Sequence, residues 1–542
     1  MRLLSSLRSS LAPFILLLHL ALLPLASGQE ENDRKEETPT EEVEESEDFD
    51  DTINKAVAPY TKAISDIVFF SVYEDTVGEG EEAVQVSVPF ILIWLVGAAL
   101  FFTFFFKFIN IRGFALSLKT IRNRYSREDD PGQISHFEAL TAAVSGTVGL
   151  GNIAGAAIAI SVGGPGAAFW MVTMGLLGMS TKFAECTLGV NFREIDKNGE
   201  VYGGPMHYLT RGMASRGLGG LGRVLAIVFS VCVIGASFGA GNMFQANQAT
   251  SQIVEATGGG LTDYRWVVGV IIAITVGLVI IGGISRIAKI TSKLVPTMAI
   301  VYVVSCLIII FSHYTEIIPS IGLIFSSAFS GEAIAGGFIG TFLQGLQRGS
   351  FSNEAGIGSA PIAHSAVKTR FAASEGLVAL LEPFIDTVIV CSMTAMVVII
   401  TGEYKNVDAE GIKLTSSSFE SVIPGFSIVL SVAVVLFALS TLITWSYYGL
   451  QGWKYLFGHS KPVDLLFKFI FCVVVVLGAA MSTGKVVEFS DAMLFSMSFA
   501  NLIGVYCLLP VVRKELKKYQ DYTKRVDNGE DLEKARAAVE SD

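Results

Sequence analysis

Hydrophobic runs of about 18 residues or more recur along most of the chain, and each is long enough to cross a bilayer as a helix. This pattern predicts an all-α polytopic membrane protein. Eleven membrane-spanning segments are expected, at Val88–Phe106, Phe137–Val162, Gly166–Val190, Leu221–Ala246, Trp266–Gly283, Leu294–Ser312, Glu332–Leu346, Glu375–Thr401, Gly425–Trp445, Val463–Met481 and Phe489–Val511.

The second segment contains residues that a helix in hydrocarbon does not favour. Its centre holds Gly146, Thr147, Gly149, Gly151, Asn152 and Gly155. Each glycine costs about 0.5–1 kcal/mol relative to alanine inside a helix. Irregular backbone at membrane depth is tolerated only where it is buried in protein or lines a cavity, so we expect a broken helix at a transport site. A glycine-rich packing face is the alternative, but it leaves Thr147 and Asn152 unexplained.

A second broken segment is expected at Glu332–Leu346, which is short and interrupted by glycines. If the first span is an accessory helix, ten spans remain, and each half of five opens with a broken helix. The two halves have opposite topology, which is typical of an inverted-repeat secondary transporter. The halves share no clear sequence identity, so this prediction of one accessory helix plus a 5+5 inverted repeat rests on topology and glycine placement.

Basic residues alternate between the two sides of the predicted membrane. The connections assigned to the inside, together with the C-terminal tail, hold 28 Lys and Arg residues, whereas the outside connections hold 4. The positive-inside rule therefore predicts an extracytoplasmic N-terminus and a cytoplasmic C-terminus. We expect the protein in the plasma membrane, which is the inner membrane in a Gram-negative cell.

The chain divides into six predicted regions. Residues 1–28 have a basic start, an apolar centre and a small-residue end, which predicts a signal peptide, with a retained first membrane helix as the alternative. The remaining regions are an acidic disordered tail (29–52), an extracytoplasmic interfacial segment (53–87), the accessory helix with its basic cytoplasmic loop (88–135), the ten-helix transport core (136–511) and a cytoplasmic tail (512–542).

The composition and the motifs of the chain exclude several classes of function. The chain is 51% hydrophobic and 16% charged, and thirteen acidic residues between Glu30 and Asp51 supply much of the net charge of -11. The six cysteines stand singly in apolar spans and make no metal-binding spacing. Phosphate-binding, zinc-protease and haem-attachment motifs are missing from the sequence. We therefore expect no enzymatic activity, no nucleic-acid partner and no obligate protein partner, and transport would draw on an ion gradient.

The predicted break supplies oxygen ligands. Unwinding frees the backbone carbonyls of Ser145, Thr147 and Val148, and Asn152 adds a side-chain oxygen. These hard ligands suit Na⁺ rather than a transition metal. The backbone amides from Gly149 to Asn152 begin the second half-helix and suit a substrate carboxylate. Because this stretch holds no Asp or Glu, a zwitterionic substrate is expected rather than a dication.

Polar residues in other spans are further candidates. Gln245 and its neighbouring amides in the fourth span would face the cavity or mark an outer helix end. Ser440 and Thr441 in the ninth span, with Trp445 close by, would complete a cation site or bond only to their own helix.

Charged residues at membrane depth are functional candidates by default. Glu382 and Asp386 in the eighth span would couple protons, or pair with a Lys or Arg near the inner end. Arg348 and Glu354 lie in a glycine-rich stretch after the second broken segment. They would form an inner gate that pairs and parts, or merely an ordered loop with an Arg–Glu bridge.

Several motifs resemble the alanine or glycine:cation symporter family. They are Gly146–Gly155 (GTVGLGNIAG), Gly163–Met171 (GGPGAAFWM), Arg348–Pro361 (RGSFSNEAGIGSAP) and Trp445–Gly449 (WSYYG). The resemblance covers about Ile53 to Val511. It implies Na⁺-coupled, sometimes H⁺-coupled, uptake of alanine or glycine through a fold like that of the bacterial leucine transporter.

The resemblance also implies roles for individual residues, because Gly149-Leu150-Gly151-Asn152 looks like the Gly-Leu-Gly-Asn of the leucine transporter's first core helix. One Na⁺ site would use the carbonyls of Ser145 and Val148 with Ser440 and Thr441. A second Na⁺ site, beside the substrate, would use the Thr147 carbonyl and the Asn152 side chain. The substrate would contact Thr147, Gly149, Gly151, Asn152, Gln245 and Trp445.

The function expected from the sequence is therefore a symporter that couples Na⁺ entry to uptake of a small neutral amino acid, alanine or glycine, by alternating access. An H⁺-coupled amino-acid permease on the same scaffold, using Glu382 or Asp386, is the main rival hypothesis. An ion channel and a non-transporting amino-acid sensor are two less favoured hypotheses.

Overall fold

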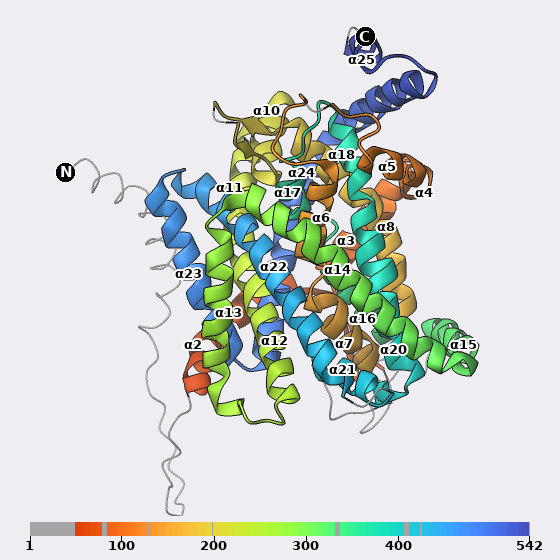
Figure 1. Ribbon diagram of the computed structural model, residues 1–542, viewed down its shortest axis with the longest axis vertical. Helices are drawn as coiled ribbons and strands as arrows, with labels where there is room; N and C mark the ends of the chain where they lie inside the picture. Colours follow the sequence, from red (N-terminus) through yellow and green to blue (C-terminus); the bar gives the residue numbers. More distant parts are fainter. Residues whose placement is uncertain are drawn as a thin grey trace, which may run out of the picture.

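The computed structural model describes residues 49–77, 84–127, 129–197, 199–330, 337–405, 411–422 and 425–540. The predicted signal peptide (1–28) and the predicted acidic tail up to residue 48 lie outside these described residues. Most of the long helices run between two ends of one bundle (Figure 1). The last long helix, α24 (Thr483–Asp527), runs along the bundle and is followed by α25 (Leu532–Glu540).

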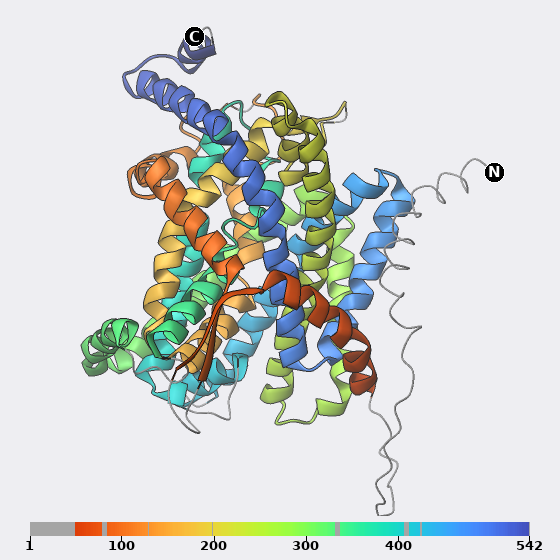
Figure 2. The same cartoon turned by 180° about the vertical axis from the view of Figure 1, so that it is seen from behind.

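The first described elements lie on the outside of this bundle. Helix α2 (Phe49–Val68) packs against α24 (Figure 2). It is followed by an antiparallel hairpin of β1 (Ser71–Val77) and β2 (Val84–Pro89), and then by α3 (Phe90–Phe105). The predicted interfacial segment (53–87) thus contains most of a helix and most of a hairpin.

The remaining elements follow in chain order. The first half contains α4 (Ile109–Arg112), α5 (Phe114–Ile121), α6 (His136–Thr147), the π-helical η3 (Gly151–Gly155), α7 (Ala156–Gly163), α8 (Ala167–Asn191), β3 (Glu194–Ile195), β4 (Val201–Tyr202), α9 (Pro205–His207), η4 (Tyr208–Gly212), α10 (Met213–Ser215), α11 (Gly219–Phe238), η5 (Gly239–Met243), α12 (Phe244–Ala256), η6 (Thr262–Tyr264), α13 (Arg265–Ile280) and α14 (Gly283–Ser312). The second half contains η7 (Tyr314–Glu316), α15 (Ile317–Phe329), α16 (Gly337–Asn353), α17 (Ala360–His364), α18 (Ala372–Ala379), α19 (Leu381–Pro383), η8 (Phe384–Cys391), α20 (Ser392–Ile400), η9 (Glu403–Lys405), α21 (Ile412–Glu420), α22 (Phe426–Phe457) and α23 (Lys461–Ala480).

The break predicted in the second span is confirmed. Helix α6 begins at a capping box, in which the Ser135 hydroxyl and the Glu138 carboxylate satisfy each other's backbone N–H groups. It ends at Thr147, and Val148 has a non-helical conformation (φ -76°, ψ 85°). The chain becomes helical again at Gly151, and the axis bends by 54° between the two pieces.

The second break lies further along the chain than predicted. The described part of the predicted Glu332–Leu346 segment belongs to α16, which continues unbroken to Asn353. The helix stops at Glu354, where φ is +54°, and helical structure resumes only at Ala360. The glycines of α16 serve close packing instead, because a Cβ at Gly345 would lie 2.5 Å from the Ala167 carbonyl oxygen of α8.

The two broken helices run in opposite directions. At the end of α7, the Gly163 carbonyl accepts a hydrogen bond from the Thr341 hydroxyl of α16 (2.8 Å). At the other end, Ile134, just before α6, pairs with Val367, just after α17. The start of one broken helix therefore lies beside the end of the other.

Length and composition support seven membrane-spanning helices in the described chain, or eight if the bent α6–α7 pair counts as one span. The predicted number of eleven is therefore not confirmed. Three other predicted spans correspond to α3 (16 residues), α8 and α16 (17 residues). The apolar helix α15 was not predicted from the sequence.

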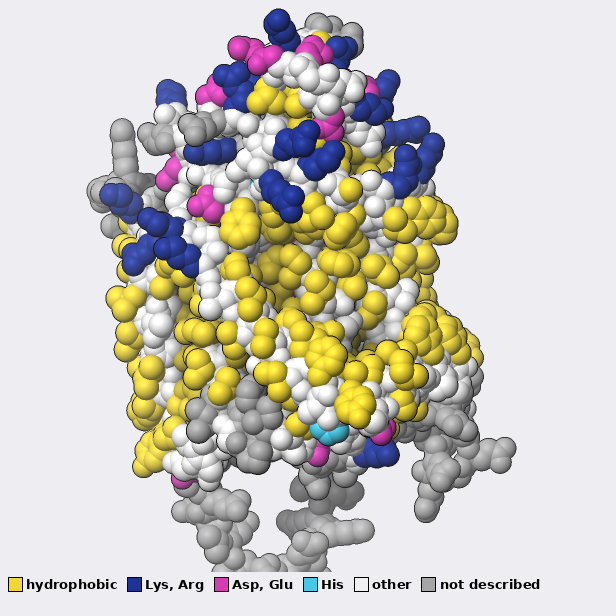
Figure 3. All heavy atoms as spheres, turned by 45° about the vertical axis from the view of Figure 1, so that its right-hand side comes forward, with side chains coloured by type: hydrophobic (Ala, Val, Ile, Leu, Met, Phe, Trp, Pro, Cys, Tyr) yellow, Lys and Arg dark blue, Asp and Glu magenta, His cyan; other side chains and the backbone are white. Residues whose placement is uncertain are grey.

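Surface chemistry distinguishes the two ends of the bundle. Hydrophobic side chains cover the middle of the face shown in Figure 3, and Lys and Arg gather toward the end that carries α25. Exposed Arg112, Lys119, Arg122 and Arg124 lie at this end, where Lys119 and Arg124 pair with Asp527 of α24. We call it the basic end.

Replacing Gly345 with alanine is expected to lower the melting temperature of the purified protein, because the added Cβ would push α16 away from α8 at a cost of about 1–3 kcal/mol. Thermal unfolding in detergent, followed by intrinsic fluorescence, measures this. Gly322→Ala in α15 is the matched control, because its Cβ would meet no atom within 4 Å. Equal melting temperatures for the two variants would show that the α16–α8 contact does not require glycine.

Candidate functional site

The interruption of α6 packs against the middle of α22. The Thr441 hydroxyl donates a hydrogen bond to the Ser145 carbonyl (3.1 Å), and the Ser145 hydroxyl donates to the Ser440 carbonyl (2.9 Å). The Thr444 hydroxyl donates to the Ser145 hydroxyl (3.0 Å). The Ser440 hydroxyl donates to the Phe437 carbonyl of its own helix, so Ser440 faces α6 with its carbonyl rather than with its side chain.

Gly149 lies at the closest approach between the interruption and its neighbours. A Cβ at this position would lie 2.5 Å from the Thr441 hydroxyl oxygen and 3.0 Å from the Gln245 Oε1 atom. A side chain at this position would have to displace Thr441 or Gln245. The next residue, Leu150, donates its backbone N–H to Gln245 Oε1 (3.1 Å), and Gln245 Nε2 donates to the Ala240 carbonyl (3.0 Å).

Asn152 connects the two broken helices. Its Oδ1 accepts the backbone N–H of Gly149 (2.9 Å), and its Nδ2 donates to the Ser352 hydroxyl of α16 (2.9 Å). Its backbone carbonyl accepts a hydrogen bond from the Thr394 hydroxyl (3.0 Å). The amides of Gly149, Leu150 and Asn152 all donate to acceptors within the protein in this conformation.

A carboxylate completes this cluster of oxygens. Asp386 is fully buried, and its Oδ1 accepts hydrogen bonds from the Ser352 hydroxyl and from the Thr387 hydroxyl (2.7 Å). The Thr147 hydroxyl donates to the Val144 carbonyl of its own helix (3.5 Å). The second oxygen, Oδ2, has no hydrogen-bond partner in the part of the chain that the structure describes. A buried carboxylate oxygen without a partner is costly, so this position calls for a cation or a proton.

Trp445 covers the other side of the interruption. Its indole Nε1 donates to the Gly146 carbonyl (3.2 Å), and the side chain is 1% exposed. The ring fits because Gly241 faces it, and a Cβ there would lie 2.2 Å from the ring carbon Cγ. Gly241 belongs to the π-helical η5. Three π-helical segments, η3, η5 and η8, thus contribute to the site, as is frequent at functional sites.

The other amides of the fourth span do not face the interruption. Asn242 donates to the Phe471 carbonyl (2.8 Å) and Asn247 to the Met481 carbonyl (2.6 Å). Both amides hold α12 and η5 against α23 and the loop after it. Of these candidates, only Gln245 reaches the break.

Arg348 and Glu354, the predicted gate residues, have other partners in this conformation. Arg348 makes a two-pronged ion pair with Asp491 of α24 (3.2 and 2.7 Å), and its guanidinium lies 5.7 Å from the centre of the Phe351 ring. Glu354 accepts a hydrogen bond from Ser359 instead. The two residues diverge because α16 continues past Arg348, whereas Glu354 already belongs to the break.

The buried acid Glu382 pairs with a basic residue, which was one of its two predicted roles. Its Oε1 accepts a hydrogen bond from Lys182 Nζ (3.0 Å), and both side chains are fully buried. Glu185, three residues after Lys182, accepts a hydrogen bond from the Asn501 side-chain amide. Asp386 was predicted to couple protons or to pair with a basic residue, and Ser352 was named only within the motif Arg348–Pro361. Thr387, Thr394 and Thr444 were not predicted, since hydroxyl residues in apolar spans give no specific signal.

Comparison with known proteins identifies the class. Residues 71–534 match the model of the Sodium:alanine symporter family, and the chain belongs to this family. It is 39% identical over 440 residues to the sodium/alanine symporter AgcS of Methanococcus maripaludis, covering 80% of this chain and 95% of that protein. It is 32% identical over 444 residues to the probable sodium/glutamine symporter GlnT of Bacillus subtilis, covering 81% and 89%.

Among solved structures, the fold is similar to that of MhsT in complex with L-phenylalanine, with a TM-score of 0.49 and 14% identity over 70% of this chain and 89% of that chain. The family membership makes this protein a cation-coupled amino-acid symporter of the membrane, not an enzyme.

Gly149→Ala is expected to reduce cation-driven amino-acid uptake by about tenfold or more, because displacing Thr441 or Gln245 costs about 1–3 kcal/mol. Uptake into proteoliposomes at equal protein content measures the effect. Gly155→Ala in the same broken helix is the matched control, since its Cβ would meet no atom within 4 Å. Wild-type uptake by Gly149→Ala would contradict a site built on this close approach.

Proposed function

We propose that this protein couples Na⁺ entry to uptake of a small neutral amino acid, alanine or glycine, across the plasma membrane by alternating access. The observation that carries the proposal is the interruption of α6, where oxygens of α6, α16, α22 and η8 converge on a few unwound residues. A small substrate suits this site because the side chains of Asn152, Gln245 and Trp445 around it are almost fully buried. The relative GlnT is named for glutamine, so substrate size is the property to test first.

The first Na⁺ site of this proposal lies between α6 and α22. It uses the carbonyls of Ser145 and Val148 with the oxygens of Ser440 and Thr441. The Thr441 hydroxyl already lies 3.1 Å from the Ser145 carbonyl oxygen, so Na⁺ binding would replace hydroxyl-to-carbonyl hydrogen bonds by ion–oxygen contacts. Such a neutral oxygen set suits a monovalent hard cation.

The second cation site of the proposal lies at Asp386. The Thr147 carbonyl and the Asn152 side chain would contribute to it, as the family resemblance implies, and Asp386 would add the negative charge. The unpartnered Oδ2 atom supports this role, and it equally supports a second candidate function, in which Asp386 carries a proton and the symporter is H⁺-coupled.

The substrate would bind with its carboxylate on the amides that follow the break. Leu150 N–H now donates to the neutral Gln245 Oε1. A carboxylate is a stronger acceptor than an amide oxygen, so the substrate would displace Gln245 and leave it free to bind elsewhere in the site. Trp445, Thr147, Gly149 and Gly151 would shape the remaining walls.

The proposed orientation of the protein in the membrane follows from the distribution of its basic residues. We infer that the basic end faces the cytoplasm and that the two antiparallel broken helices open the halves of a 5+5 inverted repeat. Asp491 lies eight residues after the start of α24, about 12 Å along the helix from the end opposite α25. The Arg348–Asp491 pair therefore would close the extracytoplasmic side.

Asn152→Ala is expected to lower Na⁺-driven alanine uptake by about tenfold or more while the protein still inserts. The mutation removes the hydrogen bonds of the Asn152 side chain to Gly149, Ser352, Asp386 and Cys391. A buried polar group left unpaired by such a loss costs about 1–3 kcal/mol. Uptake is measured in proteoliposomes at limiting and at saturating Na⁺. Asn247→Ala, which removes an amide facing the loop after α23, is the control. Wild-type uptake by Asn152→Ala at both Na⁺ concentrations would refute the role.

Replacing external Na⁺ by choline at fixed pH is expected to abolish alanine accumulation, and an inward pH gradient alone is expected not to restore it. Asp386→Asn is expected to weaken the dependence on Na⁺ together with uptake, because the neutral amide removes the charge that balances the cation. If a pH gradient drives wild-type accumulation in choline and Asp386→Asn abolishes that accumulation, the H⁺-coupled function replaces the Na⁺-coupled one.

A further inference from the structure

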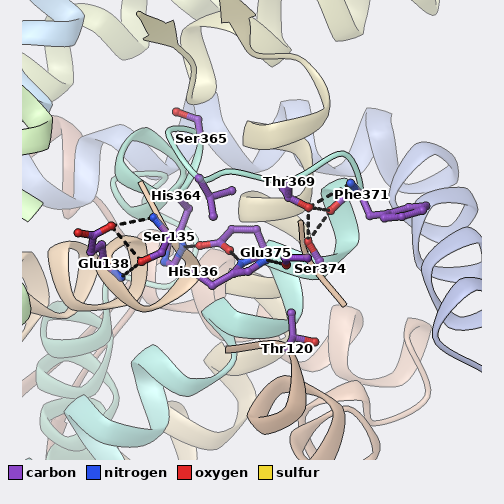
Figure 4. Close-up of polar contacts among 12 residues, drawn as sticks. Thr120, Ser135, His136, Glu138, His364, Ser365, Thr369, Phe371, Ser374 and Glu375 are labelled. Carbon is purple, nitrogen blue, oxygen red and sulfur yellow. Dashed lines mark hydrogen bonds and ion pairs between the residues drawn. The ribbon is translucent and has the colours of Figure 1, made fainter. Parts of the chain in front are cut away.

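A row of buried titratable side chains lies between the site and the basic end, and the proposed transport cycle does not use it. Its members come from α6, α17 and α18 (Figure 4). Glu375 of α18 accepts hydrogen bonds through both oxygens, from His136 Nδ1 at Oε2 and from His364 Nδ1 at Oε1 (2.5 Å). His136 Nε2 continues the row to the Ser126 hydroxyl (3.0 Å). All three charged or titratable members are at most 1% exposed.

The row continues inward through a second carboxylate. His364 Nε2 lies 3.5 Å from Glu382 Oε2, and the other oxygen of Glu382 accepts the hydrogen bond from Lys182. Neither His364 Nε2 nor Glu382 Oε2 has a properly aligned hydrogen-bond partner among the described residues. These two atoms therefore face each other, fully buried, at the centre of the row.

When hydrogens are assigned to the nitrogen and oxygen atoms of this row, the contact between His364 and Glu382 is left without one. If both carboxylates are charged, each Nδ1 facing Glu375 carries a hydrogen, as in a neutral imidazole. A neutral His364 would then present the lone pair of Nε2 to a lone pair of Glu382, which is repulsive. One additional proton removes the repulsion, whether it resides on His364, on Glu375 or on Glu382, since moving it along the row changes its position and not the count.

The net charge of the row also calls for one additional proton. Lys182 balances Glu382, and with neutral histidines the charge of Glu375 would remain uncompensated in a buried environment, which is costly. An additional proton brings the cluster to zero net charge. The other titratable or charged groups that interact electrostatically with the cluster are Glu185 and Cys186 of α8, Arg193, Glu354, Asp386, Tyr448 of α22 and Tyr519 of α24.

Three of these seven neighbours increase the demand for positive charge when they are ionised. Glu185, Glu354 and Asp386 are carboxylates, whereas Arg193 is the one cation among the neighbours just named. Burial lowers the pKa of Arg193 to about 10, so it remains cationic at neutral pH. Its guanidinium is engaged by the carbonyls of Pro131, Ser365, Val367 and Thr369.

We propose that His364, Glu375 and Glu382 form a proton-binding site that is occupied when the basic end of the bundle is closed and releases its proton when that end opens. The ligand is a single proton taken from the solution at the basic end. This goes beyond coupling at the transport site and rests on the proposed function only in assuming that the basic end opens.

The coupling to opening follows from the elements that the row joins. We define the strap as residues 131–134 before α6 and 365–369 after α17. The backbone N–H of Gln133 donates to the Ala366 carbonyl (2.8 Å) and that of Lys368 to the Ile134 carbonyl (2.7 Å). Separating α6 from α17 at this end would break the strap and the His136–Glu375–His364 contacts together, and would admit water to Glu382.

The sign of the pH dependence is fixed by this arrangement. A ligand that binds the closed state more tightly stabilises the closed state. Low pH at the basic end therefore favours a closed strap, and high pH favours opening. With one linked proton, the equilibrium between the states changes by at most about tenfold per pH unit.

Backbone hydrogen exchange of the strap tests the proposal without requiring transport. The purified protein in lipid nanodiscs is compared at pH 6 and pH 8 by mass spectrometry, with each rate divided by the intrinsic exchange rate at that pH. We expect the protection of the Lys368 and Thr369 amides to fall between several-fold and about a hundredfold from pH 6 to pH 8. The same protection at both pH values in the wild-type protein would overturn the proposal.

Glu382→Gln is the informative variant. The amide Nε2 of glutamine donates a hydrogen to His364 Nε2 without an added proton, and Lys182 then balances Glu375. The variant is expected to keep the strap protected at both pH values. Glu200→Gln replaces an exposed carboxylate at the same end and is expected to retain the wild-type pH dependence. A pH dependence that survives in Glu382→Gln would also overturn the proposal.

A second variant keeps the test decisive if Glu382→Gln does not fold. His364→Asn retains a donor to Glu375 but removes Nε2, and it is expected to lose the pH dependence of strap protection. Uptake is measured in parallel with the same preparations. Absent Na⁺-driven uptake with an intact pH dependence of the strap would contradict the proposed function alone, and intact uptake with a pH-independent strap would contradict the proton site alone.

Discussion

A peptide group in the middle of an apolar bundle has to find a hydrogen-bond partner, and this constraint organises the structure around residues 147–151. Interrupting α6 removes the partners that a continuous helix would supply. The structure replaces them with side chains from elsewhere in the chain: Gln245 from α12 for the Leu150 amide and Thr441 from α22 for the Ser145 carbonyl. Helices α12 and α22 therefore both have to hold their positions for one short break to exist, and both also carry polar groups of the site.

The packing that makes this possible depends on two glycines that are distant in sequence. Gly149 allows Thr441 and Gln245 to reach the break, and Gly241 allows the ring of Trp445 to lie against it. Side chains at these two positions would fill the space that the site occupies. The π-helical turns at η3, η5 and η8 add a residue to their helices and re-aim the side chains that follow.

Two groups of buried charges on neighbouring turns of the chain have different partners. Asp386 lies at the break with hydroxyl groups around it and one oxygen unpartnered among the described residues. Glu382, one helical turn earlier, faces Lys182 and His364. Because η8 and α19 carry both acids, a change in the position of this segment affects the transport site and the basic end together. Buried ion pairs contribute little net stability after desolvation, so their presence here is better explained by function than by folding.

The sequence by itself determined the class of this protein and the place of its first break. Apolar runs of bilayer length, the glycines around Asn152 and the Gly146–Gly155 motif are enough to indicate a membrane symporter. These features are local, because a run of hydrophobic residues or a glycine in a helix has the same physical consequence wherever the chain folds. The same local rule misplaced the second break, since the glycines of α16 serve packing against α8 and the helix ends only at Glu354.

Only the tertiary structure decided which polar residues meet. Arg348 lies six positions from Glu354 and yet pairs with Asp491, 143 positions away, and the proximity of His136, His364 and Glu375 has no local signature. Partners of this kind are set by the antiparallel placement of the two broken helices, and a sequence pattern carries no information about that placement until the bundle has closed. The physical reason is that a buried charge can pair with any partner of suitable geometry. The packing of the helices, rather than the spacing of residues along the chain, therefore determines which residue becomes that partner.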